Sequence, residues 1–139
     1  MNYWLTHFEK SGMTESPDYN NTVKYFEKFE KNFPSVKIID FGTTPQGRKL
    51  KTVIVSKDKA FTPALARKSN KAIVLIQNGI HSGEIEGKDA CMLLLRDILV
   101  TKEKSHLLDN LILLIIPVLN IDGHERLSQF NRPNQNGPK

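Results

Sequence analysis

The chain has 139 residues, of which 39% are hydrophobic and 25% charged, and it carries a net charge of +5. This length suits one ordinary domain, and the composition is typical of a folded globular protein rather than a disordered tail. The basic residues are spread along the chain without a long run, which argues against nucleic-acid binding. The longest apolar stretch, Leu111–Ile116, has the length of a strand, so no membrane partner is expected.

The N-terminus and the cysteine content give two further expectations. The first residues, MNYWLTHFEKSG, lack a basic stretch followed by an apolar core, so we expect no signal peptide in this chain, and the sequence assigns no compartment. Cys91 is the single cysteine, which excludes an internal disulfide. Its apolar neighbours predict a buried thiol.

The first predicted element is a helix that starts at Ser16-Pro17-Asp18, where a capping hydroxyl, a first-turn proline and an acid come together. Pro34 ends this helix. Its apolar face repeats at steps of three and four residues: Tyr19, Val23, Phe26, Phe29 and Phe33. Two strands follow over residues 36–41 and 50–55, and the turn-rich residues 43–48 between them predict a hairpin.

Residues 72–76 are apolar at every position, as expected of an interior strand covered on both faces. Gly79 and Gly83 bracket a tight loop, and residues 85–100 form a long helix whose apolar middle predicts packing on more than one side. Another apolar strand covers residues 111–118, and the chain then turns polar and loop-like. These elements predict an α/β fold, a mixed sheet with helices on both faces, in which the sheet is incomplete.

The segment with the most chemical information is residues 77–84, QNGIHSGE, between the interior strand and the long helix. Open α/β sheets place their ligand sites at such strand ends. His81 and Glu84 lie three residues apart across a turn with a glycine, so an imidazole and a carboxylate can converge on one point. Zinc accepts both groups at about 2.0–2.2 Å, and a catalytic site of two histidines and one glutamate leaves a position for water.

A structural interpretation of the same residues stays open at this point. Pairs of the form His-x-x-Glu arise by chance. Ser82 could cap the helix, while Glu84 and Glu86 complement its N-terminal dipole. Spacing and position alone therefore leave zinc binding and helix capping as equal hypotheses.

The flanking sequence adds a resemblance. Residues 78–84, NGIHSGE, followed by residues 117–123, PVLNIDG, resemble the zinc metallocarboxypeptidase family of the carboxypeptidase A type. Gly47-Arg48 is similar to the hairpin between that family's first two strands. The resemblance implies a phosphorylase/hydrolase-like carboxypeptidase fold, incomplete in this chain, with His81 and Glu84 as ligands of one Zn²⁺ ion. It implies a structural role for the turn formed by Asn120, Asp122 and Gly123.

The chain departs from the family pattern at two positions: Gly83 stands where digestive members have an arginine, and Ile121 replaces a proline. The resemblance places the third zinc ligand, a histidine, after Lys139, together with the general-base glutamate and the groups that bind the substrate carboxylate. Arg132 does not stand in the family's arginine motif and receives no such role.

The remaining candidates near the motif are expected to stay outside the site. A helix over residues 85–100 would be about 24 Å long, which places His106 far from His81. We expect His7, His106 and His124 at the surface. Glu86 follows Glu84 by two residues and so points about 200° away on a helix, as a dipole-compensating acid.

The resemblance implies a zinc-dependent hydrolase of the C-terminal peptide bond that acts on peptide or protein C-termini, with residues 1–139 as the N-terminal part of one catalytic domain. Two alternatives remain: a zinc deacylase of N-acyl amino acids, and a non-catalytic fragment or binding domain. The 139-residue chain alone is expected to be inactive, because no catalytic base lies within it. Self-association is expected through an unpaired sheet edge.

Overall fold

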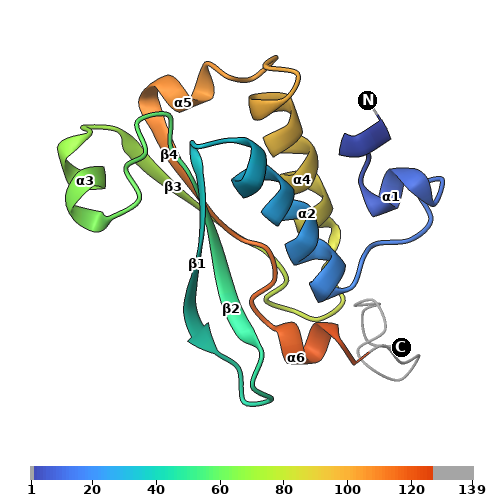
Figure 1. Ribbon diagram of the computed structural model, residues 1–139. Coiled ribbons are helices and arrows are strands. Elements are labelled where there is room, and N and C mark those ends of the chain that lie inside the picture. Colours follow the sequence, from blue (N-terminus) through green and yellow to red (C-terminus); the bar gives the residue numbers. More distant parts are fainter. Residues whose placement is uncertain (1, 127–139) are drawn as a thin grey trace, which may run out of the picture.

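The computed structural model describes residues 2–126, which form a mixed sheet with helices on both of its faces (Figure 1). Strands β1 and β2 and strands β2 and β4 pair antiparallel, and β3 pairs parallel with β4. The strands, in the sheet order β1-β2-β4-β3, are β1 Val36–Thr43, β2 Lys49–Val55, β4 Leu111–Ile116 and β3 Ala72–Gln77. The helices are the 3-10 helix η1 Asn2–Trp4, α1 His7–Lys10, α2 Tyr19–Asn32, α3 Pro63–Lys68, α4 Glu86–Leu99, α5 Leu107–Asn110 and α6 Ile121–His124.

Helix α2 starts at the predicted place but with a different cap. The Asp18 carboxylate accepts a hydrogen bond from the backbone N–H of Asn21 at 2.7 Å. The prediction of Ser16 as the capping residue is wrong, because Asp18 directly precedes the first helical residue and Ser16 lies too far upstream. The predicted apolar face is confirmed: its first four residues are buried, and Phe33 packs partly buried against the same core.

The main core lies between the sheet and the two helices α2 and α4. Phe29, Met92, Leu95 and Ile115 are fully buried there. A smaller cluster on the opposite face joins Ile54, Ala60 and Ile112 to side chains around α3. Burial of each large side chain contributes about 2 kcal/mol, so these two layers supply most of the stabilisation of the sheet.

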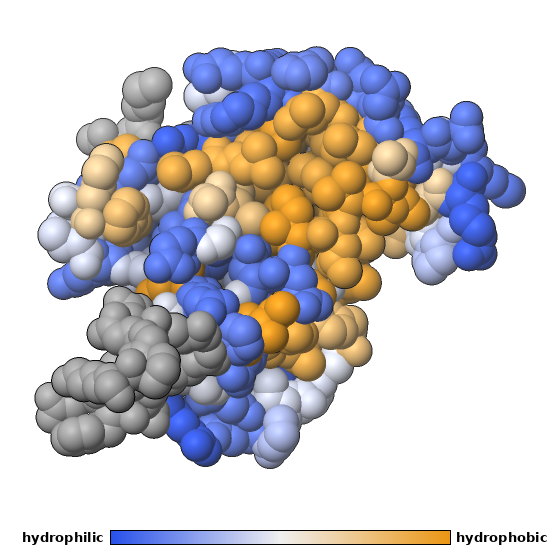
Figure 2. Space-filling view, turned by 180° about the vertical axis from the view of Figure 1, so that it is seen from behind, coloured by the Kyte–Doolittle hydropathy of each residue, from blue (hydrophilic) through white to orange (hydrophobic). Residues whose placement is uncertain are grey.

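Strand β3 is the edge of the described sheet and is largely exposed. Ile73, Val74 and Leu75 are 52%, 38% and 56% exposed, and apolar surface dominates the middle of the face seen in Figure 2. The prediction of an interior strand covered on both faces is therefore wrong for residues 2–126, where β4 pairs with one edge of β3 and no element pairs with the other. The prediction that α4 packs on more than one side is also wrong: Ala90 is exposed and Leu93 half-buried, so the helix packs mainly on one side.

The short helices escape the sequence analysis because one turn carries no periodic signal. Residues 121–124, predicted as loop, form α6, in which the Asn120 side chain accepts a hydrogen bond from the Gly123 N–H at 3.0 Å. Cys91 is 4% exposed, as predicted, and burial raises the pKa of its thiol. Among residues 2–126 no helix combines the length and the apolar character needed to cross a membrane.

Candidate metal site

The loop between β3 and α4 is bound to the segment after β4 by backbone hydrogen bonds. Asn78 N–H donates to the Ile116 carbonyl at 3.1 Å, and Leu119 N–H donates to the Asn78 carbonyl at 2.9 Å. Asn120 N–H donates to the Gly79 carbonyl at 2.8 Å. The two sequence motifs therefore lie side by side at the carboxyl ends of two parallel strands, where α/β sheets carry their ligand sites.

Two glycines allow this loop its close contacts. Gly79 has a φ of +58°, and a Cβ there would lie 2.9 Å from Val118 Cγ1. A Cβ on Gly87 would lie 2.3 Å from Asn78 Oδ1, so the first turn of α4 approaches the end of β3 only because this residue is glycine. Gly83, expected to help turn the loop, does not have a positive φ.

The His81 imidazole and the Glu84 carboxylate lie together on this loop. His81 Nδ1 and Glu84 Oε2 are 2.9 Å apart, and the Glu84 N–H donates to the His81 carbonyl at 3.1 Å. The two side chains are 48% and 57% exposed. An ordinary surface ion pair has the same geometry, so the role of the pair as metal ligands stays a prediction.

The chemistry of this pair fits part of a zinc site. An imidazole nitrogen and a carboxylate oxygen are both accepted by zinc, and neither is sealed off from an approaching ion. Within residues 2–126, however, no third histidine, cysteine or acid joins them in a group able to hold a metal. The described residues thus fit half of a zinc site.

The other candidate residues lie elsewhere. His7 and His106 are exposed, as expected; His106 borders a cavity beside Ile98, near the C-terminal end of α4. Glu86 is exposed in the first turn of α4, where an acid complements the helix dipole. The expectation that His124 is exposed is wrong: α6 turns it inward to 6% exposure, with Nδ1 2.8 Å from Glu125 Oε1. Arg132 lies outside the described residues.

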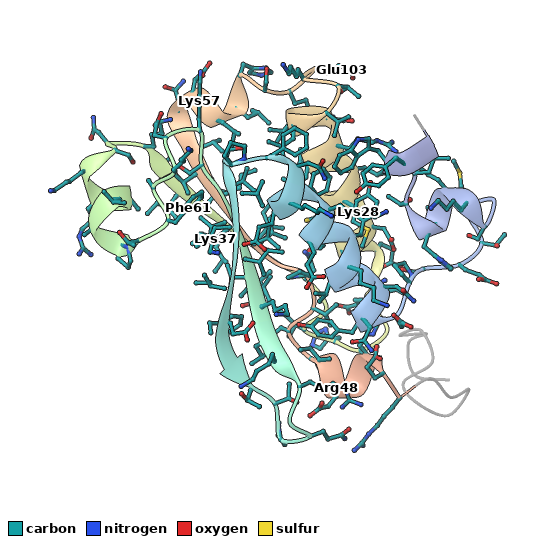
Figure 3. All side chains as sticks on the ribbon, in the orientation of Figure 1. Lys28, Lys37, Arg48, Lys57, Phe61 and Glu103 are labelled. Atoms are coloured by element: carbon teal, nitrogen blue, oxygen red, sulfur yellow. The ribbon has the colours of Figure 1, made fainter. Side chains whose placement is uncertain are left out.

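Asp122 connects the second motif to the β1–β2 hairpin. Its carboxylate accepts hydrogen bonds from the Thr44 hydroxyl at 2.9 Å, the Gln46 N–H at 3.1 Å and the Arg48 guanidinium at 2.6 Å. Figure 3 shows Arg48 at the end of the hairpin, next to α6. Burial alone would raise the pKa of Asp122, but these three donors outweigh it and lower the pKa. This agrees with the structural role that the resemblance gives to the turn.

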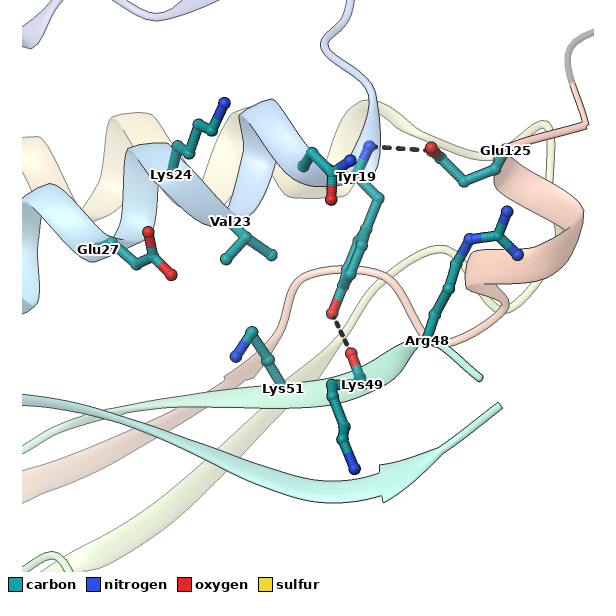
Figure 4. A pocket seen from close by; sticks show the side chains of 9 residues that line it. Tyr19, Val23, Lys24, Glu27, Arg48, Lys49, Lys51 and Glu125 are labelled. Carbon is teal, nitrogen blue, oxygen red and sulfur yellow. Dashed lines mark hydrogen bonds between the residues drawn. The ribbon is translucent and has the colours of Figure 1, made fainter. Parts of the chain in front are cut away.

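A cavity of about 540 Å³ lies between the start of α2 and the hairpin (Figure 4). Tyr19 borders it, with its N–H donating to Glu125 Oε1 at 2.9 Å and its hydroxyl donating to the Lys49 carbonyl at 2.6 Å. Burial raises the pKa of Tyr19 to about 12. Neither His81 nor Glu84 lines this cavity, so it is separate from the candidate metal site.

Comparison with known proteins places this geometry in a family. Residues 22–138 match the model of the zinc carboxypeptidases. The chain belongs to the zinc carboxypeptidase family. Among solved structures, carboxypeptidase A from Helicoverpa armigera is similar with a TM-score of 0.67 and 24% identity over 78% of this chain. Bovine thrombin-activatable fibrinolysis inhibitor, in complex with tick carboxypeptidase inhibitor, is similar with a TM-score of 0.61 and 23% identity over 80%. These likenesses confirm the carboxypeptidase fold.

The chain covers only part of its zinc carboxypeptidase relatives. It spans 25% of the Helicoverpa chain and 33% of the bovine chain. The inactive metallocarboxypeptidase ECM14 of Saccharomyces cerevisiae is 30% identical over 136 residues, which cover 90% of this chain and 30% of that protein. The family is in general zinc-dependent and acts on peptides, and it includes this member described as inactive.

Proposed function

We propose that residues 1–139 are the N-terminal part of a single zinc metallocarboxypeptidase domain and that His81 and Glu84 are its first two zinc ligands. The observation that carries this proposal is the 2.9 Å approach of His81 Nδ1 to Glu84 Oε2, on a loop bound to the end of β4. Membership of the zinc carboxypeptidase family supports it. In this proposal the third ligand, a histidine, follows Lys139.

The residues of this chain would position the metal rather than transfer protons. A bound zinc ion would lower the pKa of its water and polarise the carbonyl of the peptide bond to be cleaved. His81 and Glu84 would present one nitrogen and one oxygen from a loop that the Asn120–Gly79 hydrogen bond holds in place. We assign removal of the water proton to the family's general-base glutamate, which the resemblance places after Lys139.

The exposed apolar surface of β3 supports the proposal that the domain continues. Ile73 and Leu75 are more than half exposed although they belong to an uninterrupted apolar strand. The chain spans 30% of ECM14, which leaves ample length for elements that would cover β3 in a complete domain. Peptide or protein C-termini would then be the substrates.

A second candidate function is a binding protein of the same fold without catalysis. The 30% identity with ECM14, a relative described as inactive, favours this alternative. Zinc binding and catalysis must therefore be tested separately. The remaining alternative, a zinc deacylase, shares the His-x-x-Glu motif and differs from a carboxypeptidase in that it acts on N-acyl amino acids.

The test measures bound zinc and hydrolysis in the full-length protein. His81→Ala and Glu84→Ala should each abolish stoichiometric zinc after dialysis, whereas the control Glu86→Gln, an exposed acid two residues further on, should retain it. Stoichiometric zinc in His81→Ala would contradict the assignment of His81 as a zinc ligand. Wild-type protein that binds zinc but cleaves no peptide would favour the binding protein, and cleavage of N-acyl amino acids alone would favour the deacylase.

A further inference from the structure

The segment that precedes α2 is attached to α4 at two places. Near the C-terminal end of α4, the Arg96 guanidinium donates to the Glu9 carboxylate at 2.7 and 2.8 Å and to the Trp4 carbonyl at 3.3 Å. Near its N-terminal end, the Ser16 hydroxyl accepts a hydrogen bond from the Lys88 ammonium and donates one to the Asp89 carboxylate. The two attachments are comparable in kind but lie at opposite ends of the helix.

The Ser16 attachment buries charge. Lys88 is 1% and Asp89 8% exposed, and their charged groups are 3.5 Å apart. Burial lowers the pKa of Lys88, and Asp89 opposes this shift. Asp89 Oδ1 has no hydrogen-bond partner among the residues described. Well-packed apolar side chains in place of a buried ion pair often leave a protein at least as stable, so a gain in folding stability does not account for this cluster. A role in fixing one geometry is a better explanation.

The cluster follows the candidate zinc ligands closely in the sequence, at the start of α4. Lys88 is the third residue of α4 and follows Glu84 by four residues in the chain, whereas Arg96 lies about 12 Å further along the helix. The residue before α4, Ile85, makes no side-chain capping hydrogen bond. The start of α4 is instead held by Gly87 packed on Asn78 and by the hydroxyl of Ser16, 72 residues upstream of Lys88.

We propose that Ser16, Lys88 and Asp89 form a positioning cluster through which the N-terminal segment fixes the start of α4, and with it Glu84, for metal binding. The proposal rests on the zinc site of the proposed function and adds the part that sets its affinity. Ser16 lies outside residues 22–138, which match the zinc carboxypeptidase family, so the family match does not include this contact.

The test measures the Zn²⁺ affinity of the full-length protein and the visible absorption spectrum of its Co²⁺-substituted form. Ser16→Ala should weaken Zn²⁺ binding about tenfold, as removal of a group that orients a ligand does, and should alter the Co²⁺ spectrum. Ser16→Thr retains the hydroxyl and should restore both. The matched control, Arg96→Gln, breaks the other attachment; it should lower stability and leave affinity and spectrum unchanged.

A second variant separates positioning from folding. Lys88→Met/Asp89→Asn removes both charges, so neither is left buried without its partner, and it should fold yet bind Zn²⁺ more weakly. Unchanged affinity and spectrum in both Ser16→Ala and the double variant, with stability reduced as in Arg96→Gln, would overturn the proposal. Retention of zinc by His81→Ala would instead overturn the zinc assignment itself, so the two failures are distinguishable.

Discussion

Strands β3 and β4 are neighbours of similar composition in opposite environments. Ile112 and Ile115 of β4 are 1% and 0% exposed, whereas Ile73 and Leu75 of β3 are 52% and 56% exposed. Ile73 nevertheless pairs directly with Ile112 across the parallel ladder. An uninterrupted apolar strand therefore indicates the environment to which it is suited, and it does not identify the elements that provide that environment.

The difference follows from what surrounds each strand. Both edges of β4 are paired, with β2 and with β3, and its two faces contribute to separate clusters, one under α2 and α4 and one near α3. Within residues 2–126, β3 is paired on one edge, and among its residues Ile76 packs against the main core. We therefore regard the exposed part of β3 as the contact surface for the rest of the proposed domain.

Truncation of one side chain in each strand tests the difference between β3 and β4 directly. In the 139-residue chain Ile115→Ala should cost about 2–5 kcal/mol of unfolding free energy, because it leaves a cavity in the core. Leu75→Ala, at an exposed position, should cost less than about 0.5 kcal/mol. Urea unfolding measures both. In the full-length protein the cost of Leu75→Ala should rise into the range of a buried leucine, and an unchanged cost would contradict the continuing domain.

Much of the fold could be predicted from local patterns. The 3.6-residue period of α2, the turn-rich hairpin residues and the apolar strands are features of contiguous sequence, and each element was found at its place. The cap of α2 and the exposure of β3 could not be predicted in the same way. Ser16 and Asp18 are both good capping residues, and the sequence alone does not show which of them directly precedes the first helical residue; in the structure Asp18 caps α2 and Ser16 contacts Lys88 on α4.

Part of the candidate site could likewise be predicted from local sequence, and part of it could not. His81 and Glu84 are three residues apart, so their spacing alone suggested that they meet. Other contacts around the two motifs join residues that are distant in the sequence: Asp122 binds Arg48 across 74 residues, and Lys88 binds Ser16 across 72. A single sequence contains no periodic or spacing signal for such pairs. The inward turn of His124 was missed for a related reason, because α6 is a single turn.

Alkaline pH should lower the free energy of unfolding through two buried tyrosines of α2. Tyr19 and Tyr25 donate to the carbonyls of Lys49 and Trp4, both at 2.6 Å, and burial raises both pKa values to about 12. An unfolded tyrosine ionises near pH 10, so the unfolded chain loses its protons first. The stabilisation is complete below about pH 10 and is lost as pH rises towards 12, by about 2–3 kcal/mol for each tyrosine.

Urea unfolding across this pH range, with tyrosinate absorbance recorded in parallel, measures the effect. Tyr19→Phe and Tyr25→Phe should each reduce the loss, because each removes one buried phenol. Leu75→Ala should leave the pH dependence as it is, since β3 carries no ionisable side chain. A pH dependence that persisted in the double phenylalanine variant would show that other groups cause it.

The smallest expected effect is weak self-association of the 139-residue chain through the edge of β3 that no element of residues 2–126 pairs with. Its six residues carry no charge, and such an edge can pair with a second copy, while the net charge of +5 opposes the encounter. Association should therefore strengthen with salt, which screens that repulsion. Leu75→Lys should abolish it in sedimentation velocity runs over a range of concentrations. Leu65→Lys on α3, where the leucine is 49% exposed, adds the same charge away from the strand and should retain most of the association. If both replacements acted equally, net charge rather than the β3 edge would control association, and a wild-type chain that stayed monomeric at high concentration would contradict the prediction outright.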